Sequence, residues 1–330
     1  MWQLNNTSPF AASVALFPNE DAVDTLYVMV KATFNIDATL TLVEKQAKPF
    51  EADMYWDEPG ESSVRYGSDM HVGKAATDII VLGHACAPDK SEVREMEVSV
   101  SVGHVHKTIR VFGDRHWQDG KMSEPTPFKT MPLVYERAYG GIHRVNGKLD
   151  AAETRNPVGR GFVGGRKKEE MNGMPLPNLE DPNFLIRSLA DKPTPACFGC
   201  SAPNWHPRAG FAGTYDGDWQ MKRAPYLPKD FDKRFLNMAH GDLVYPGFMA
   251  GGEAVRVVGM HASGAIQFNL PRIRLLVNIA VADKKKQPEL ALETLVVDTD
   301  AMTLSLVWRA AMLCDKKSFQ LGEVSVTRVS

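Results

Sequence analysis

The sequence has few cysteines, almost no net charge and no long apolar run, and each of these absences excludes a class of protein. Four cysteines in 330 residues are too few and too scattered for a disulfide-stabilised fold, so reduced thiols are expected. Lysine plus arginine number 38 against 40 acidic residues, which gives no broad electrostatic attraction to nucleic acid or to an anionic membrane. No segment approaches the roughly 18 apolar residues that a membrane-spanning helix needs.

The first six residues also lack the basic stretch and the apolar run of a secretory signal, so a cytoplasmic location is expected. The apolar share of 44% and the charged share of 24% are those of an ordinary globular protein and not of a disordered chain. We therefore expect a folded protein that does not insert into a membrane.

What the sequence does contain is apolar residues at every second position, the pattern of β-strands. Residues 26–36 are expected to form a half-buried strand. Apolar residues at helical spacing do not fill any long window, which argues against wound α/β folds and helical bundles. The sequence therefore predicts a mainly β protein of sandwich-like antiparallel sheets with a few short helices. The other predicted strands and hairpins lie in residues 79–82, 96–111, 254–270, 273–281 and 290–310.

A segment dense in glycine and proline, residues 125–228, separates a strand-rich N-terminal part, residues 1–124, from a strand-rich C-terminal part, residues 229–330. Because a long structureless loop is improbable in a compact domain, we expect short strands, turns and one or two brief helices there. Residues 230–239 are the best helix candidate. We treat the whole chain as a single unit.

Local motifs that often carry chemistry are incomplete in this sequence. Cys197 and Cys200 have the spacing of a zinc-site pair and His206 follows, but a second such pair is absent, so two reduced thiols are favoured and metal binding stays open. The glycine-rich residues 159–164 are spelled like a dinucleotide-binding loop but lack the flanking strand and helix. No nucleophile-elbow or zinc-protease motif occurs. We expect no catalytic residue, no metal and no cofactor.

Two pairs of aspartates differ in what they suggest. Asp298 and Asp300 lie where a hairpin must turn, so a role in the turn is favoured. Asp216, which pairs with Asp218, stands beside Tyr215 and close to Trp219. This arrangement of acid, hydroxyl and indole leaves a carbohydrate- or nucleotide-active enzyme as the alternative function.

The loop-like segments are rich in arginine and aromatic side chains, which protein interfaces favour because these residues bury a large area and keep a polar group. Filling the space between sheets and loops is an equally good explanation. The candidate partner-binding residues are Arg115, Trp117, Arg137, Tyr139, Trp205, Tyr215, Asp216 and Trp219.

Two series of segments, read in order, carry a resemblance to a known family. In the first half they are residues 6–10, 30–34, 68–70 with Lys74, 77–78, 111–117 and 131–141. In the second half they are residues 156–162, 176–178, 213–219, 228–232, 251–253 and 307–309. Together these segments resemble a bacterial family classed as domain-of-unknown-function family 2169 and encoded beside type VI secretion genes.

This resemblance implies an adaptor, or chaperone, that binds a toxin effector of type VI secretion and helps to load it onto the spike protein VgrG or its PAAR-type tip. The resemblance brings no catalytic residues with it. A structural component of the secretion apparatus is a further alternative. The sequence does not indicate which effector is bound, which surface binds it, or how many copies assemble.

Overall fold

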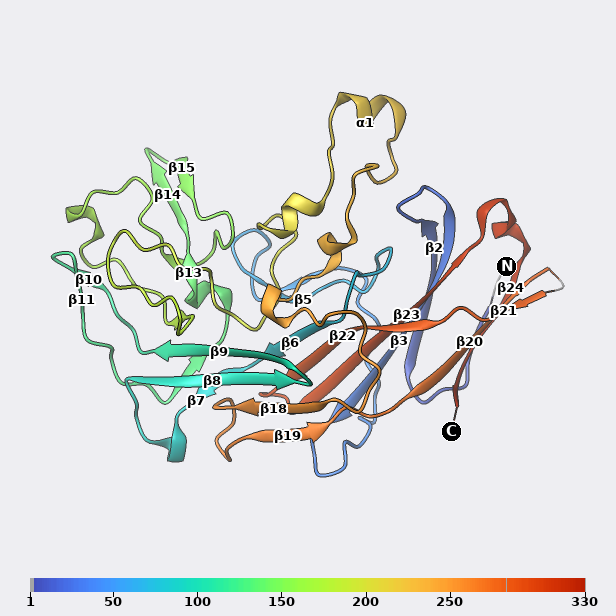
Figure 1. The fold of residues 1–330 in the computed structure, drawn as a ribbon, viewed down its shortest axis with the longest axis horizontal. Helices are drawn as coiled ribbons and strands as arrows, with labels where there is room; N and C mark the ends of the chain where they lie inside the picture. Colours follow the sequence, from blue (N-terminus) through green and yellow to red (C-terminus); the bar gives the residue numbers. More distant parts are fainter. Residues whose placement is uncertain (1–2, 283, 330) are drawn as a thin grey trace.

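The computed structural model describes residues 3–282 and 284–329. Three larger sheets contain most of the long strands (Figure 1). The single α-helix of the described residues, α1 (Gly217–Lys222), has six residues. The prediction of a mainly β fold with few short helices is therefore confirmed. No helix in the described part of the chain is long and apolar enough to cross a membrane.

The first sheet combines strands from both ends of the chain. Its order is β2 (Ala11–Pro18), β3 (Asp24–Asn35), β23 (Thr303–Leu313), β22 (Leu290–Asp298) and β6 (Asp78–Leu82). Neighbouring strands are antiparallel, except that β22 and β6 are parallel. The hairpin predicted for residues 290–310 is thus the β22–β23 pair, and the predicted strand 79–82 is β6.

The central strand β3 is buried on both faces, so the prediction that it is half-buried was wrong. Val28 and Val30 belong to the main apolar core, while Tyr27 and Met29, on the opposite face, form a separate core with Val72. The polar alternation that suggested exposure reflects charged and hydroxyl side chains that are themselves covered.

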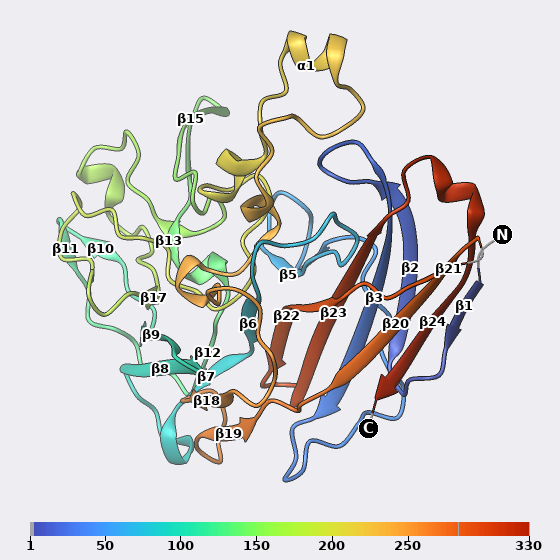
Figure 2. The ribbon, with the colours of Figure 1, turned by 45° about the vertical axis from the view of Figure 1, so that its right-hand side comes forward.

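The second sheet packs against the first as the other half of a sandwich (Figure 2). Its order is β1 (Gln3–Asn6), β24 (Leu321–Val329), β20 (Arg274–Val281) and β21 (Lys284–Lys286), and β20 is the strand predicted for residues 273–281. Side chains of β20 and β24 meet those of β3 in the main core. Burial of each large apolar side chain in such a core contributes about 1.5–3 kcal/mol.

The third sheet contains two of the predicted hairpins. Its order is β17 (Leu179–Glu180), β9 (Val105–Phe112), β8 (Glu95–Val102), β18 (Ala254–Val258) and β19 (Ile266–Asn269), all antiparallel. This sheet joins the two strand-rich parts to the central segment, since β17 comes from the latter.

The central segment is rich in short strands and turns, as predicted. A second apolar core holds it together through Trp117, Tyr139, Met171, Leu176 and Ile186. Short strands here and elsewhere are β4 (Met54–Tyr55), β5 (Val64–Tyr66), β7 (His84–Cys86), β10 (Trp117–Gln118), β11 (Lys121–Met122), β12 (Thr130–Pro132), β13 (Tyr139–Gly140), β14 (Ile142–Val145), β15 (Lys148–Ala152) and β16 (Arg160–Gly161).

The helix predicted for residues 230–239 is absent. Only a 3₁₀ turn, Lys233–Leu236, forms there, capped by the Asp232 carboxylate. Asn237 is extended and donates hydrogen bonds from Nδ2 to the Ala76 carbonyl and to Asp78 Oδ1. These tertiary bonds end the turn after four residues.

The glycine-rich residues 159–164 serve close packing. Arg160 and Gly161 form β16, which pairs with β13. A side chain at Gly159 would place its Cβ 2.6 Å from the Ala138 carbonyl oxygen, so only glycine fits there. The observed geometry agrees with a structural loop and does not show the strand–turn–helix context of a phosphate site.

Candidate functional site

An exposed projection carries three of the predicted partner-binding residues. Residues 213–230, here called the arm, extend away from the sheets with α1 at the far end (Figures 1 and 2). The Asp230 carboxylate closes the base of the arm, because it accepts hydrogen bonds from Thr214 N at 3.0 Å and Thr214 Oγ1 at 2.7 Å. These bonds hold the pKa of Asp230 below its ordinary value.

The far end of the arm has a defined internal structure. Asp216 caps α1 by accepting a hydrogen bond from Trp219 N at 2.8 Å. The indole Nε1 of Trp219 donates to the Tyr226 carbonyl at 2.8 Å, and the Tyr215 ring packs edge-on against Trp219 with 4.7 Å between ring centres. Arg223 ties the arm to the β2–β3 turn by donating to the Glu20 carbonyl at 2.6 Å.

Three large side chains of the arm face solvent. Tyr215 is 54% exposed, Met221 77% and Tyr226 40%. Scattered exposed apolar residues need no explanation, but several on one projecting, internally bonded element are typical of an interaction site. The arm is therefore the candidate partner-binding surface.

The position of Asp216 bears on the enzyme alternative. Its side chain is exposed and engaged as the helix cap, and it lines neither of the two cavities described below. The second aspartate pair forms a turn as expected, because Asp298 Oδ1 accepts hydrogen bonds from Asp300 N and Ala301 N. Among the described residues, no three His, Cys, Asp or Glu side chains gather as a metal site.

Three predicted partner-binding aromatics lie in the interior instead. Trp117 and Tyr139 are 1% and 2% exposed and belong to the second core. Trp205 is 2% exposed and packs against Tyr135, with 5.3 Å between ring centres. These three side chains fill space between sheets and loops, so the prediction that they contact a partner is corrected: they present no surface to one.

The two predicted arginines form internal ion pairs. Arg115 is buried, lies over the Phe112 ring at 3.8 Å and pairs with Glu180. Arg137 is partly buried and donates from Nη1 to Asp114 Oδ1 at 2.9 Å. Arg115 is thus also corrected to an interior residue, and the guanidinium of Arg137 is already occupied.

A buried ionic network on the outer face of the first sheet was not predicted. Lys74 Nζ lies 2.7 Å from both Asp78 Oδ2 and Thr294 Oγ1. Glu293 accepts hydrogen bonds from Lys74 N at 2.9 Å and from Arg309 Nε at 2.7 Å. All four charged residues are 4% exposed or less. The two positive and two negative charges therefore compensate one another away from water, as buried ions require.

His71 adjoins this network and stays neutral. Its Nε2 accepts a hydrogen bond from Arg309 Nη2 at 3.1 Å. Burial, followed by the charges of Arg309 and Lys74, lowers the pKa of His71 well below its usual value. The neutral ring acts as an acceptor that satisfies part of the arginine.

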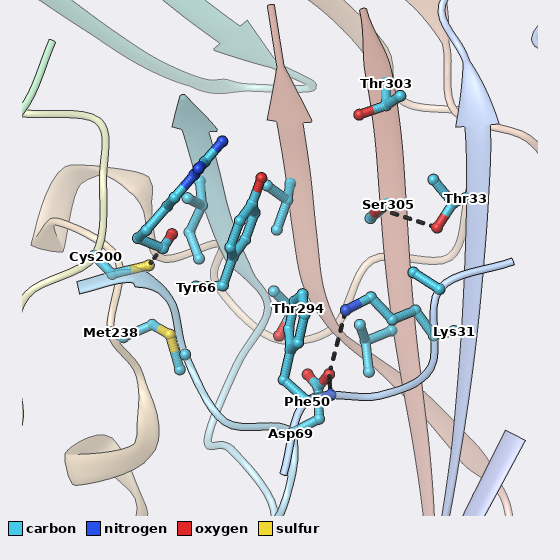
Figure 3. A pocket seen from close by; sticks show the side chains of 16 residues that line it. Lys31, Thr33, Phe50, Tyr66, Asp69, Cys200, Met238, Thr294, Thr303 and Ser305 are labelled. Atoms are coloured by element: carbon cyan, nitrogen blue, oxygen red, sulfur yellow. Dashed lines mark hydrogen bonds and ion pairs between the residues drawn. The ribbon is translucent and has the colours of Figure 1, made fainter. Parts of the chain in front are cut away.

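A small cavity of about 210 Å³ lies between the first sheet and the chain that covers it (Figure 3). Lys31 Nζ points toward Asp69 Oδ2, 3.5 Å away, and lies 3.4 Å from the centre of the Phe50 ring. Burial lowers the pKa of Lys31, and Asp69 opposes that shift. Thr33 Oγ1 and Ser305 Oγ are 3.3 Å apart. The charges in this cavity are already paired within the protein.

Cys197 and Cys200 are buried thiols. The Cys197 Sγ lies 3.4 Å from the Leu133 carbonyl oxygen, and burial raises the pKa of each thiol to about 12. His206, the third predicted neighbour, is exposed. Since metal binding requires the thiolate, this environment favours the protonated thiols.

Residues 21–309 match a family described as "uncharacterized protein conserved in bacteria", DUF2169. This chain belongs to DUF2169. The resemblance noted from the sequence is therefore confirmed at the level of the family. No curated protein and no solved structure matches the chain.

Most of the segments through which this DUF2169 chain resembles its family lie in the interior. Lys74, Asp78 and Arg309 form the buried network, and Asp69 accepts a hydrogen bond from Arg309 through its carbonyl. These residues stabilise the fold. The arm is the exception, because its similar residues lie at the surface.

Proposed function

We propose that this DUF2169 chain is an adaptor that binds a toxin effector of type VI secretion in the bacterial cytoplasm and helps to load it onto VgrG or a PAAR-type tip. The observation that supports partner binding is the arm, with its exposed Tyr215, Met221 and Tyr226. The link to type VI secretion rests on the sequence resemblance.

The internal structure of the arm suits a binding element. Its internal hydrogen bonds fix the backbone before a partner arrives, which reduces the entropy lost on binding. Aromatic side chains in the centre of an interface often contribute about 2 kcal/mol or more each when truncated. A stable complex would bury on the order of 1,200 Å² or more in total, so the arm would supply the anchor and adjoining surfaces the rest.

The test is co-expression with a type VI toxin effector and spike protein from the same bacterium. We expect the chain to co-purify with the toxin, and Tyr215→Ser combined with Met221→Ser to weaken that complex at least tenfold. Phe184→Ser is the matched control, because Phe184 is 66% exposed and lies outside the arm. Failure to co-purify with either partner, together with unchanged toxin secretion in a deletion strain, would refute the proposal.

A further inference from the structure

A second cavity, of about 400 Å³, lies beside the base of the arm and has mostly apolar walls. Its volume is within the range of small-molecule sites. Phe211, two residues before the arm, lines one side, and Pro195, Pro207 and Val244 contribute other apolar walls. An apolar cavity of this kind selects a ligand by the few polar groups that it contains.

Arg208 is the first of these polar groups. It is 7% exposed and lines the cavity. Its Nε donates to the Phe235 carbonyl at 2.6 Å and its Nη1 to the Ser201 carbonyl at 2.7 Å. Within the described chain these two are its side-chain hydrogen bonds, so Nη2 has no partner and the guanidinium forms no ion pair. An arginine keeps its charge even when buried.

Tyr135 is the second polar group. It is 4% exposed and also lines the cavity. The Tyr135 hydroxyl has no hydrogen-bond partner in the described part of the chain. Burial raises the pKa of Tyr135 well above 10, so the hydroxyl keeps its proton at neutral pH and is available as a donor.

The other charged groups at the cavity cancel one another. Arg155 is paired with Glu153 at 2.7 Å and Arg234 with Asp232 at 2.6 Å. Burial, followed by the charge of Lys107, lowers the pKa of His240 to about 4, so its ring is neutral at pH 7. The remaining positive charge at the wall is that of Arg208.

More distant acids do not remove this charge. Asp53 and Asp78 attract Arg208 from beyond ion-pair distance. Asp78 is already bonded to Lys74 at 2.7 Å, and Asp53 Oδ1 accepts a hydrogen bond from Ser68 N. Among the residues that the structure describes, Arg208 therefore lacks a direct counter-ion.

We propose that this cavity binds an apolar carboxylate. The carboxylate accepts hydrogen bonds from Arg208 Nη2 and the Tyr135 hydroxyl, and the hydrocarbon part of the ligand fills the apolar walls. Hydrogen bonds to an ion are the stronger kind, and a desolvated arginine prefers a carboxylate to any neutral group. The ligand is a free organic acid or the carboxyl terminus of a polypeptide. The site does not depend on the adaptor function proposed above.

Titration calorimetry with 3-phenylpropanoate tests the site, with 3-phenylpropanamide as the uncharged probe. We expect saturable binding of the acid and at least tenfold weaker binding of the amide. Tyr135→Phe should weaken acid binding about tenfold, because it removes the hydroxyl and keeps the ring. Tyr226→Phe, which removes a hydroxyl outside the cavity, should leave binding unchanged. Circular dichroism melting checks that both variants fold.

The tripeptide Gly-Gly-Phe, with a free or an amidated carboxyl terminus, distinguishes the two sources. Binding of 3-phenylpropanoate but of neither peptide supports a free acid as ligand, whereas binding of the free peptide but not the amidated one supports a polypeptide terminus. Equal binding of acid and amide, no binding of any acid, or undiminished acid binding by Tyr135→Phe would overturn the proposal.

Discussion

Substitution of Glu293 by glutamine should destabilise the protein strongly. Glu293 and Arg309 are 3% and 4% exposed, and the carboxylate also accepts a hydrogen bond from Lys74 N. Glutamine keeps the shape but removes the charge, which leaves two buried cations facing the single carboxylate of Asp78. Removing one partner of a buried ion pair costs about 3–5 kcal/mol. That loss is a large share of a total stability of about 5–15 kcal/mol.

Urea unfolding followed by tryptophan fluorescence measures this loss as a decrease in the transition midpoint. Glu97→Gln is the matched control, because the Glu97–Arg110 contact of 2.9 Å is close to the 2.7 Å of Glu293–Arg309 but lies at the surface, and surface pairs contribute about 0–1 kcal/mol. The double variant Glu293→Leu with Arg309→Met should be less destabilised than Glu293→Gln, since it leaves no unpaired charge at that position. A loss below about 1 kcal/mol for Glu293→Gln would refute the reasoning.

Three further predictions follow from the environments of single side chains. Cys197 and Cys200, whose pKa values burial raises to about 12, should not react with a thiol reagent at pH 8 until urea unfolds the chain; reaction in the native state would contradict their burial. His240 has a pKa of about 4 in the folded chain, below its value of about 6.5 in the unfolded chain. Because the unfolded state binds more protons between these two values, the free energy of unfolding should fall as pH decreases from 6.5 toward 4, by up to about 3 kcal/mol. The urea midpoints at pH 7 and pH 5 should therefore differ less for His240→Gln than for the parent chain. Asp216→Ala should cost about 1 kcal/mol of helix capping and speed proteolysis of the arm, whereas Asp216→Asn keeps the cap and should behave like the parent; loss of turnover of any small molecule in Asp216→Asn would instead support an enzyme.

The sheets could be predicted from the sequence because their signal is local. In the β8–β9 hairpin every second residue from Met96 to Val102 is apolar, and the alternation resumes after the turn at Gly103. Apolar residues at every second position are what a strand with one covered face requires. The loop-rich character of residues 125–228 was equally local, since glycine and proline interrupt regular elements wherever they gather.

Burial by distant parts of the chain could not be predicted in the same way. Lys31 and Thr33 are polar and suggested an exposed face of β3, yet residues 47–69 cover them. Trp117 and Trp205 have the residue type of an interface but lie in cores built from segments far apart in sequence. Contact of Lys74 with Thr294, and pairing of Glu293 with Arg309, needs the register between β6, β22 and β23, which no local pattern contains.

The pairing of β3 with β23 has a consequence for synthesis on the ribosome. Thr25 of β3 lies opposite Leu313 of β23, so the middle of the first sheet cannot form until nearly the whole chain has been translated. At about 5–20 residues per second, β3 waits on the order of tens of seconds with its apolar side chains exposed. A nascent chain of this kind is a natural substrate for ribosome-associated chaperones, and fragments truncated before β23 should aggregate.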